Sequence, residues 1–233
     1  MPATNEYARP EYTFAAVENH LMFSTDKTLD RPHWHEPGTH HAAALAGYVT
    51  GKPVFMTEGN ALWRRYWGEK LGTTQDDLRQ AAWACATAAS SFTWCGHTSL
   101  PLTVRGPGGL PFFGTDNPYT LSAQAIDVLG DVMNRELVFY RMTPQDALLS
   151  GHDKQNVFCL AEPSHQYLVF ASAGKPFSLN LAAGNYTANA WLDVKSGTQT
   201  KLSAITLTAS KVSAFTPPNT QTDWALLIRE STP

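Results

Sequence analysis

The sequence has little that would hold a fold together covalently or through a metal. Its 233 residues include three cysteines, Cys85, Cys95 and Cys159, without a Cys-x-x-Cys spacing. An odd number of thiols with no such spacing argues against a disulfide framework and a structural zinc site. We interpret the cysteines as small buried hydrophobic residues. Cofactor motifs are also missing, because there is no Gly-x-Ser-x-Gly elbow and the glycine-rich loop at 106–109 lacks a P-loop lysine. We expect no cofactor.

Clustered charge and long hydrophobic runs are absent as well. The net charge is −3, and the 17 Lys and Arg residues are scattered along the chain. This pattern predicts neither a nucleic-acid partner nor a polybasic membrane patch. The apolar runs are far shorter than the roughly 20 residues that span a bilayer. The first six residues lack the basic and apolar regions of a signal peptide. As it stands, the sequence predicts a cytoplasmic chain, with the compartment of any longer parent left open.

Aromatic residues are plentiful. Phe, Trp and Tyr make up 11% of the chain, including seven Trp, within an otherwise ordinary globular composition of 43% hydrophobic and 16% charged residues. Flat aromatic faces pack against the C–H faces of sugar rings, but hydrophobic cores use the same residues. The composition therefore favours carbohydrate binding without deciding it.

The first part of the chain alternates between predicted strands and helices. Short β-rich apolar runs occur at residues 11–17, 52–57 and 91–95. Helical patterns follow them at 39–48, 73–89 and 121–137, with Thr39 and Thr73 or Thr74 as expected caps. Crossovers of a dozen or more residues imply parallel strands.

The pattern changes after Arg141. Short strands separated by Gly, Asn and Pro turns are predicted at 156–160, 166–170, 177–181, 186–191, 202–207 and 224–228. They indicate a small antiparallel β-sandwich of about 80 residues. We predict two domains, a partial TIM-barrel-like βα domain at 1–145 and a C-terminal β-sandwich domain at 146–233.

Three predicted strands end in polar residues, where parallel α/β proteins collect functional groups. Glu18 and His20 follow the first strand, Glu58 and Asn60 the second, and His97 the third. A carboxylate at a strand tip that is followed by Gly fits a glycosidase nucleophile. The alternative is a Glu that only accepts hydrogen bonds from a helix N-terminus or pairs with one of the arginines at 64 and 65.

Three segments resemble a known family. Residues 52–59, Lys-Pro-Val-Phe-Met-Thr-Glu-Gly, resemble the seventh strand of (β/α)₈-barrel glycoside hydrolases that carry a nucleophilic Glu at its tip. Residues 79–83 and 91–97 are similar to the next helix and the eighth strand of apiosidase-like members. Residues 141–144 and 190–197 resemble their C-terminal, collagen-binding-type β domain. The implied fold is α/β plus all-β: a partial (β/α)₈ barrel of about three βα units, strands six to eight, followed by a small antiparallel β-sandwich.

The resemblance implies retaining hydrolysis of glycosidic bonds, with Glu58 as nucleophile. The family's acid/base Glu lies on the fourth strand, which this strand numbering leaves out of the chain, and Glu18 is the in-chain candidate. The expected substrate-binding residues are His20, Asn60, His97, Trp34, Trp63, Trp67 and Trp94. A single catalytic carboxylate would favour the alternative, which is a non-catalytic carbohydrate- or protein-binding remnant of a glycosidase.

A metal site is not expected. His33, His35, His40 and His41 are close in sequence, but extended spacing and adjacent helix positions direct them apart. We interpret them as solvated or substrate-edge histidines.

The predicted parallel sheet implies a partner. With helices on one face only, its other face and its edges stay uncovered. We therefore predict a homo-oligomer that completes the half-barrel.

Overall fold

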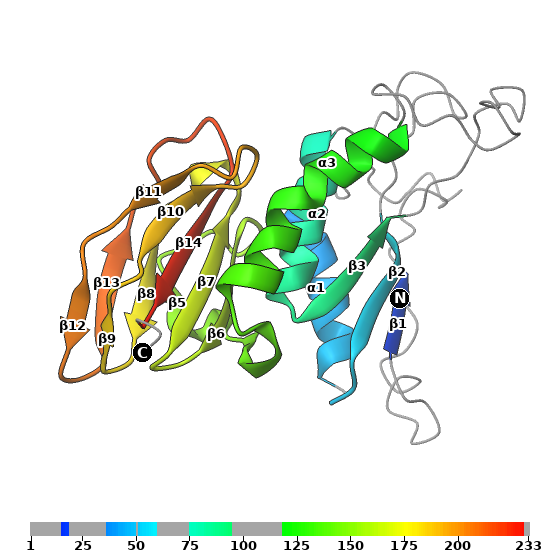
Figure 1. The fold of residues 1–233 in the computed structure, drawn as a ribbon. Helices are drawn as coiled ribbons and strands as arrows, with labels where there is room; N and C mark the ends of the chain where they lie inside the picture. Colours follow the sequence, from blue (N-terminus) through cyan, green and yellow to red (C-terminus); the bar gives the residue numbers. More distant parts are fainter. Residues whose placement is uncertain (1–14, 19–35, 50, 60–74, 95–117, 231–233) are drawn as a thin grey trace, which may run out of the picture.

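The computed structural model describes residues 15–18, 36–49, 51–59, 75–94 and 118–230, which form four layers (Figure 1). A small parallel sheet is followed by a layer of helices, a large antiparallel sheet and a smaller antiparallel sheet. The helices therefore lie between two sheets, and this arrangement explains much of the packing described below.

The parallel sheet has three strands in the order β1-β2-β3. They are β1 (Ala15–Glu18), β2 (Val54–Gly59) and β3 (Ser90–Trp94). Both strand pairs are parallel, as the alternation of strands and helices predicts. Val54 and Ser90 are buried, whereas Phe55 and Ser91, the next residue on each strand, are exposed. Of the described positions, one face of the sheet is thus covered and the other is open.

The helix layer consists of α1 (Pro37–Tyr48), α2 (Gln75–Thr87) and α3 (Pro118–Asp131). A π-turn (Val132–Glu136) follows α3, so the predicted helix at 121–137 changes its pitch in its last part. The predicted Thr39 cap is wrong, because α1 begins at Pro37, and Glu36 precedes it without a side-chain cap. Proline suits the first helical turn, where its missing N–H has no partner in any case.

Helix α2 is buried on nearly every side. Every residue from 81 to 87 is buried, and α2 contacts β2 and β3 as well as the large antiparallel sheet. Its alanines allow close approach on the side of the parallel sheet, where Cys85 and Ala88 pack with Ala44 and Val54. On the other side, Trp83 stacks on Phe170 with ring centroids 5.8 Å apart.

The antiparallel part is built from short strands, as predicted. They are β4 (Thr143–Pro144), β5 (Leu149–Ser150), β6 (Val157–Glu162), β7 (Gln166–Ala171), β8 (Phe177–Leu181), β9 (Gly184–Tyr186), β10 (Ala190–Asp193), β11 (Gln199–Lys201), β12 (Ile205–Leu207), β13 (Lys211–Phe215) and β14 (Trp224–Arg229). The large sheet has the order β11-β10-β14-β7-β6-β4, and the small one β13-β8-β5, with β12-β9 beside them. The expected strand at 186–191 is divided between β9 and β10, and β4, β5, β11 and β13 were not predicted.

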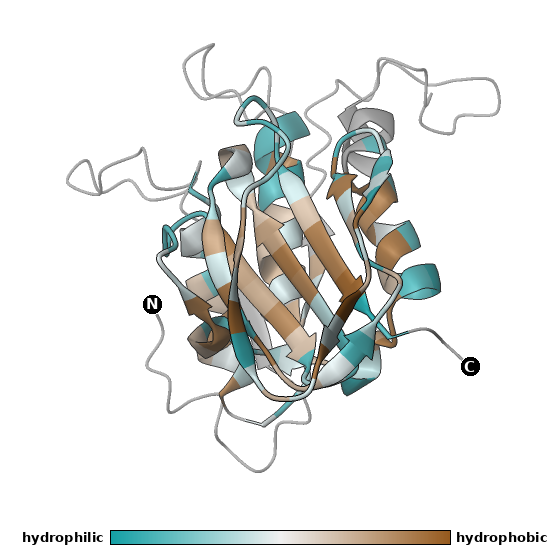
Figure 2. Ribbon diagram, turned by 90° about the vertical axis from the view of Figure 1, so that its left-hand side faces the viewer, coloured by the Kyte–Doolittle hydropathy of each residue, from teal (hydrophilic) through white to brown (hydrophobic). Residues whose placement is uncertain are grey.

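Strands β6, β7 and β14 are buried on both faces. Phe158, Leu160 and Phe170 belong to the core shared with the helices. Cys159 and Val169, at alternate positions, belong to the core between the two antiparallel sheets. Figure 2, in which the antiparallel part faces the viewer, shows strands that are brown along their central stretches and teal toward the turns. Their near-continuous apolar runs therefore result from two cores and not from an alternation of core and solvent.

The motif from Trp191 to Gly197 forms the turn between β10 and β11. Asp193 Oδ1 accepts hydrogen bonds from the backbone N–H groups of Lys195 and Ser196, at 2.8 and 3.0 Å. Gly197 has a φ of +73° and donates to the Asp193 carbonyl at 2.9 Å. This spacing of Asp and Gly thus has a local structural reason, because Asx turns and positive φ favour these residues.

The two described cysteines are buried, as expected for small hydrophobic residues. Cys85 packs in the α1–α2 region and Cys159 in the sandwich core. Burial raises the pKa of both thiols well above the usual range for cysteine. Cys95 lies outside the described residues. Within the described part of the chain, no helix is long and apolar enough to cross a membrane.

One hydrophobic core contains residues from both sides of the domain boundary that we predict between residues 145 and 146. The boundary itself stays a prediction. Gly38, at the start of α1, approaches the loop before β6 so closely that a Cβ would collide with the backbone and side chain of Gln155. The Gly38 N–H donates to the Gln155 carbonyl at 2.9 Å. This loop is itself held by Asp153, which accepts hydrogen bonds from Gln155 N–H and the Asn156 side chain, both at 2.9 Å.

Replacing Trp83 by Ala should destabilise both parts of the molecule together. The side chain is fully buried between α2 and the large sheet, and a cavity of that size costs about 3–5 kcal/mol. Urea unfolding followed by far-UV circular dichroism and by tryptophan fluorescence measures the loss. As a control, Tyr140→Ala, at a side chain that is 84% exposed, should change stability by less than about 0.5 kcal/mol. Separate transitions for the two probes in the wild type would contradict a shared core.

Asp153 should make stability depend on acid pH. Hydrogen bonds from Gln155 and Asn156 lower the pKa of this carboxyl below its ordinary value of 3.8. Because the folded state binds the proton less readily, the stabilisation is present above the unfolded pKa and lost as pH falls through the folded one. Asp153→Asn should therefore lower stability at pH 6, and its difference from wild type should shrink as the pH falls below 3.8. A difference that stays constant on acidification would show that the charge is not responsible.

Candidate functional site

The carboxyl ends of the parallel strands bring several predicted site residues to one sheet edge. Glu18 is the last residue of β1 and pairs in register with Glu58, near the end of β2. Trp94, the last residue of β3, pairs with Gly59. Three of the predicted positions, Glu18, Glu58 and Trp94, therefore lie on neighbouring strands at the same edge.

An extra residue in β2 creates this alignment. Val17 pairs with Met56, but Glu18 pairs with Glu58, so Thr57 is left without a partner on β1. On the other side, Phe92 pairs with Met56 and Trp94 with Gly59, which again leaves one residue too many in β2. Such a bulge is uncommon between parallel strands and is over-represented next to active sites, where it redirects a side chain. Without it, Glu18 would pair with Thr57.

The other predicted site residues lie outside the described part of the chain. They are His20, Trp34, Asn60, Trp63, Trp67 and His97. The arginines at 64 and 65, the alternative partners of Glu58, lie outside it as well. The described site thus consists of the backbone positions of Glu18, Glu58, Gly59 and Trp94.

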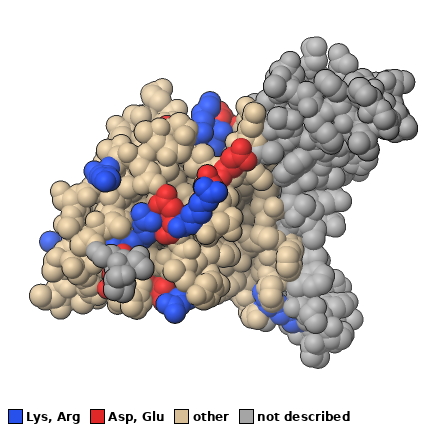
Figure 3. All heavy atoms as spheres, in the orientation of Figure 1, with Lys and Arg blue, Asp and Glu red and all other residues tan. Residues whose placement is uncertain are grey.

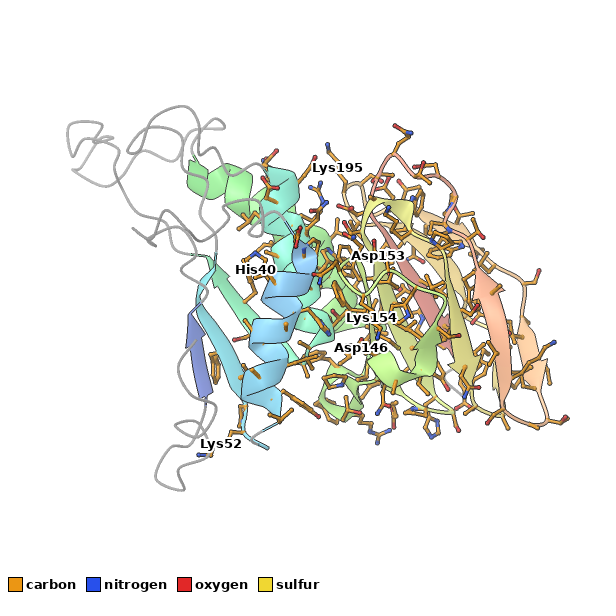
Figure 4. All side chains as sticks on the ribbon, turned by 180° about the vertical axis from the view of Figure 1, so that it is seen from behind. His40, Lys52, Asp146, Asp153, Lys154 and Lys195 are labelled. Carbon is orange, nitrogen blue, oxygen red and sulfur yellow. The ribbon has the colours of Figure 1, made fainter. Side chains whose placement is uncertain are left out.

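The prediction that His40 and His41 are solvated or at a substrate edge is wrong. Both are buried, at 1% and 4% exposed. The ring of His41 stacks on Phe158 at 4.1 Å, its Nδ1 lies 2.8 Å from the Ala84 carbonyl oxygen, and its Nε2 lies 2.7 Å from Asp146 Oδ2. The physical reason is that the antiparallel sheet covers this part of α1. Figure 4 shows α1 with His40, and the segment with Asp146 facing the helix layer.

His41 and Asp146 form the first of several polar connections between the helices and the sandwich. Asp146 Oδ1 also accepts the backbone N–H of Cys159 at 2.8 Å, so the carboxylate links α1 to β6. In the second connection, Gln80 on α2 donates to both carboxylate oxygens of Asp223 at 3.1 Å. The same Asp223 accepts from Ser172 Oγ at 3.0 Å.

These contacts fix the two helices that cover the site-bearing strands. Sequence reasoning missed them, because the paired residues are 105 and 143 positions apart. Periodicity reports which residues of an element are buried, but it does not report which distant element covers them.

Charges on the described surface are paired more than clustered. Arg229 and Glu136 are 2.9 Å apart, and Arg135 and Asp131 3.4 Å. Figure 3 shows blue and red side chains beside one another on this face. Within the described residues, no group of three His, Cys, Asp or Glu side chains is placed to hold a metal ion.

A family model described as "Putative collagen-binding domain of a collagenase" matches residues 144–229, the antiparallel part of the chain. No curated protein matches the sequence.

Several solved structures share the fold. A glycoside hydrolase aligns with a TM-score of 0.58 at 18% identity, covering 77% of this chain and 43% of its own. A glycoside hydrolase of family 5 from Bacteroides vulgatus gives 0.57 at 18% identity, with 77% and 42% covered. A "putative glycoside hydrolase" from the same organism gives 0.51 at 13% identity, with 97% and 43% covered.

The chain spans less than half the length of these structures. At such identities, the likeness concerns the fold. The antiparallel part of this chain is similar to a collagen-binding family model, and the structural neighbours of the chain are glycoside hydrolases.

Proposed function

We propose that this chain carries part of the active site of a retaining glycoside hydrolase, with Glu58 as nucleophile. The observation that carries the proposal is the bulge in β2, which brings Glu58 opposite Glu18 at the carboxyl edge of the sheet. A bulge interrupts ladder hydrogen bonding and persists where the altered register is useful. The fold shared with glycoside hydrolases supports the same interpretation.

Retaining hydrolysis uses a second carboxyl group roughly 5–5.5 Å from the nucleophile. Within this chain, the proposed acid/base is Glu18, whose backbone is the register neighbour of Glu58. A carboxyl group from another polypeptide is the alternative.

The chemistry then has two steps. The Glu58 carboxylate attacks the anomeric carbon, the glycosidic bond breaks, and the acid/base gives its proton to the leaving oxygen. Water next attacks the same carbon, gives a proton to the acid/base and releases Glu58 as a carboxylate. Trp94 on β3, together with Trp34, Trp63 and Trp67, is proposed to stack on sugar rings, and His20, Asn60 and His97 to bind hydroxyl groups.

We also propose that β1, β2 and β3 correspond to strands six to eight of a (β/α)₈ barrel. The parallel order and the helices on one face support this assignment. We propose an apiosidase-like substrate specificity on the basis of the same sequence resemblance.

A second candidate function is non-catalytic binding of carbohydrate or protein. The observation in its favour is that a collagen-binding-type family model covers residues 144–229, the antiparallel part of the chain. Binding to immobilised polysaccharide or collagen without hydrolysis of any glycoside would favour this function.

Glu58→Gln should abolish hydrolysis of aryl glycosides. The amide retains the shape but cannot attack the anomeric carbon, and loss of a nucleophile lowers kcat by a factor of roughly 10³ to 10⁶. The measurement is release of the aryl alcohol across a panel of sugars. With Glu58→Ala, azide should restore release and give a glycosyl azide of the opposite anomeric configuration. Wild-type rates in Glu58→Gln would rule out the nucleophile assignment.

Glu18→Gln separates an in-chain acid/base from one supplied elsewhere. If Glu18 protonates the leaving oxygen, its loss should slow the hydrolysis of glycosides with poor leaving groups by roughly 10² to 10⁴-fold. The first step should hardly slow for glycosides whose leaving group is a strongly acidic phenol. The slope of log kcat/KM against leaving-group pKa measures this. An unchanged slope would assign the acid/base to another residue and leave the Glu58 assignment intact.

A further inference from the structure

His41 is a buried titratable residue that the proposed chemistry does not use. Its ring lies between α1 and β6, where it stacks on Phe158 at 4.1 Å. Both ring nitrogens face oxygen atoms: Nδ1 is 2.8 Å from the Ala84 carbonyl oxygen, and Nε2 is 2.7 Å from Asp146 Oδ2. These are hydrogen-bond distances, so each of the two contacts contains a proton.

The proton of the Nδ1 contact comes from the ring. A carbonyl oxygen only accepts hydrogen bonds, so Nδ1 donates to Ala84. The Thr87 hydroxyl, 3.3 Å from Nδ1, donates within α2 to the Trp83 and Ala84 carbonyl oxygens, at 3.0 and 2.9 Å. A neutral imidazole carries one ring proton. With that proton on Nδ1, the Nε2 of a neutral His41 would be a bare acceptor.

The Nε2 contact therefore needs an additional proton. A bare ring nitrogen and a carboxylate both accept hydrogen bonds, so they repel each other at 2.7 Å. Either His41 is an imidazolium beside a carboxylate, or Asp146 is a neutral acid that donates to the ring. In both cases the pair holds one proton more than a neutral histidine and a carboxylate in water.

The surroundings favour the charged form of the pair. The Asp146 side chain is 32% exposed, and its Oδ1 accepts the backbone N–H of Cys159 at 2.8 Å. Hydrogen bonds of this kind stabilise a carboxylate. On the other side, Phe158 stacks on the ring with an interplanar angle of 16°, and the face of an aromatic ring attracts a cation.

The other ionisable groups around the pair do not take the place of this proton. On the loop after β5, burial lowers the pKa of His152 below its ordinary value of 6.5, so its imidazole is neutral at pH 7. Asp153 and Lys154 on the same loop carry opposite charges. On β6, burial raises the pKa of the Cys159 thiol, which stays protonated. Helix α2 presents a carbonyl and a hydroxyl group, and the neighbouring His40 on α1 is buried.

We propose that His41 and Asp146 form a proton-dependent contact between the helix layer and the sandwich. The additional proton lies between Nε2 and Oδ2 and joins α1 to the turn before β5. Because α1 contacts β1 and β2, this proton ties the parallel sheet to the antiparallel part. When alkaline pH removes it, two acceptors face each other and the contact opens. The inference does not rest on the proposed function, since neither residue belongs to the candidate site.

The contact makes stability depend on alkaline pH. In the unfolded chain, a histidine loses its proton near pH 6.5, roughly its reference value, whereas the folded pair keeps the proton. Above that pH the folded state binds one proton more than the unfolded state, so the unfolding equilibrium constant rises about tenfold per pH unit. The stabilisation is thus complete below the unfolded value and disappears once the folded pair loses its proton.

NMR of the histidine ring nitrogens in the ¹⁵N-labelled full chain tests the additional proton. At about pH 7.5, where an ordinary histidine is neutral, we expect protons on both ring nitrogens of His41. In Asp146→Asn, the amide can still accept the Cys159 N–H and can donate to Nε2, so only Nδ1 should be protonated. His41→Gln assigns the signals. A bare Nε2 in the wild type, beside a carboxyl group whose ¹³C signal is that of a carboxylate, would overturn the proposal.

Urea unfolding between pH 6 and 9 tests the consequence for stability. The alkaline decrease of about tenfold per pH unit should be present in the wild type and absent in His41→Gln. Asp146→Asn, which keeps the shape of the pair, should lose it as well, so the test holds if one variant fails to fold. His165→Gln is the matched control and should behave as wild type, because this exposed histidine pairs with Glu230 at the surface. The same decrease in wild type, His41→Gln and Asp146→Asn would contradict a proton held by this pair.

Discussion

The burial of α2 between two sheets is the constraint on which the rest of the structure depends. Trp83 fills the space between α2 and the large antiparallel sheet, and it stacks on Phe170. On the opposite side, small residues of α2 pack against the parallel sheet. Helix α2 therefore contacts β2 and β3 on one side and the large antiparallel sheet on the other, and close-packed interiors leave little room for adjustment. The antiparallel part is thus a support for the site-bearing strands as well as a unit with its own family model.

This packing also determines which sheet face stays open. One face of the large sheet is covered by helices, and the other by β8 and β13. Asn180 and Val212 are register neighbours on the outer face of the small sheet, and Val212 is 58% exposed.

Most elements were predictable from the sequence, because local patterns determine them. The spacing of apolar residues located α2, and the Asp193–Gly197 turn follows from local hydrogen bonding and a positive φ. The surroundings of His41 were not predictable. Its partner Asp146 is 105 positions away, and an imidazole looks the same in sequence whether a sheet covers it or water does. The start of α1 was misplaced for a different reason, since Thr39 is a good cap by type but Pro37 already fixes the first turn.

The candidate site shows the same division between local and long-range information. The sequence indicated that three strands end in polar residues, and the parallel order places those ends together. It did not indicate the extra residue in β2, because a bulge is a property of the pairing with β1 and β3 and not of β2 alone. A shift of one position exchanges the two faces of a strand, so the bulge decides whether Thr57 or Glu58 is the neighbour of Glu18. Like charges on neighbouring strands repel each other, so the register of Glu18 with Glu58 offers no stabilisation of its own. It is the observation on which the proposed nucleophile and acid/base rest, and pattern alone could not supply it.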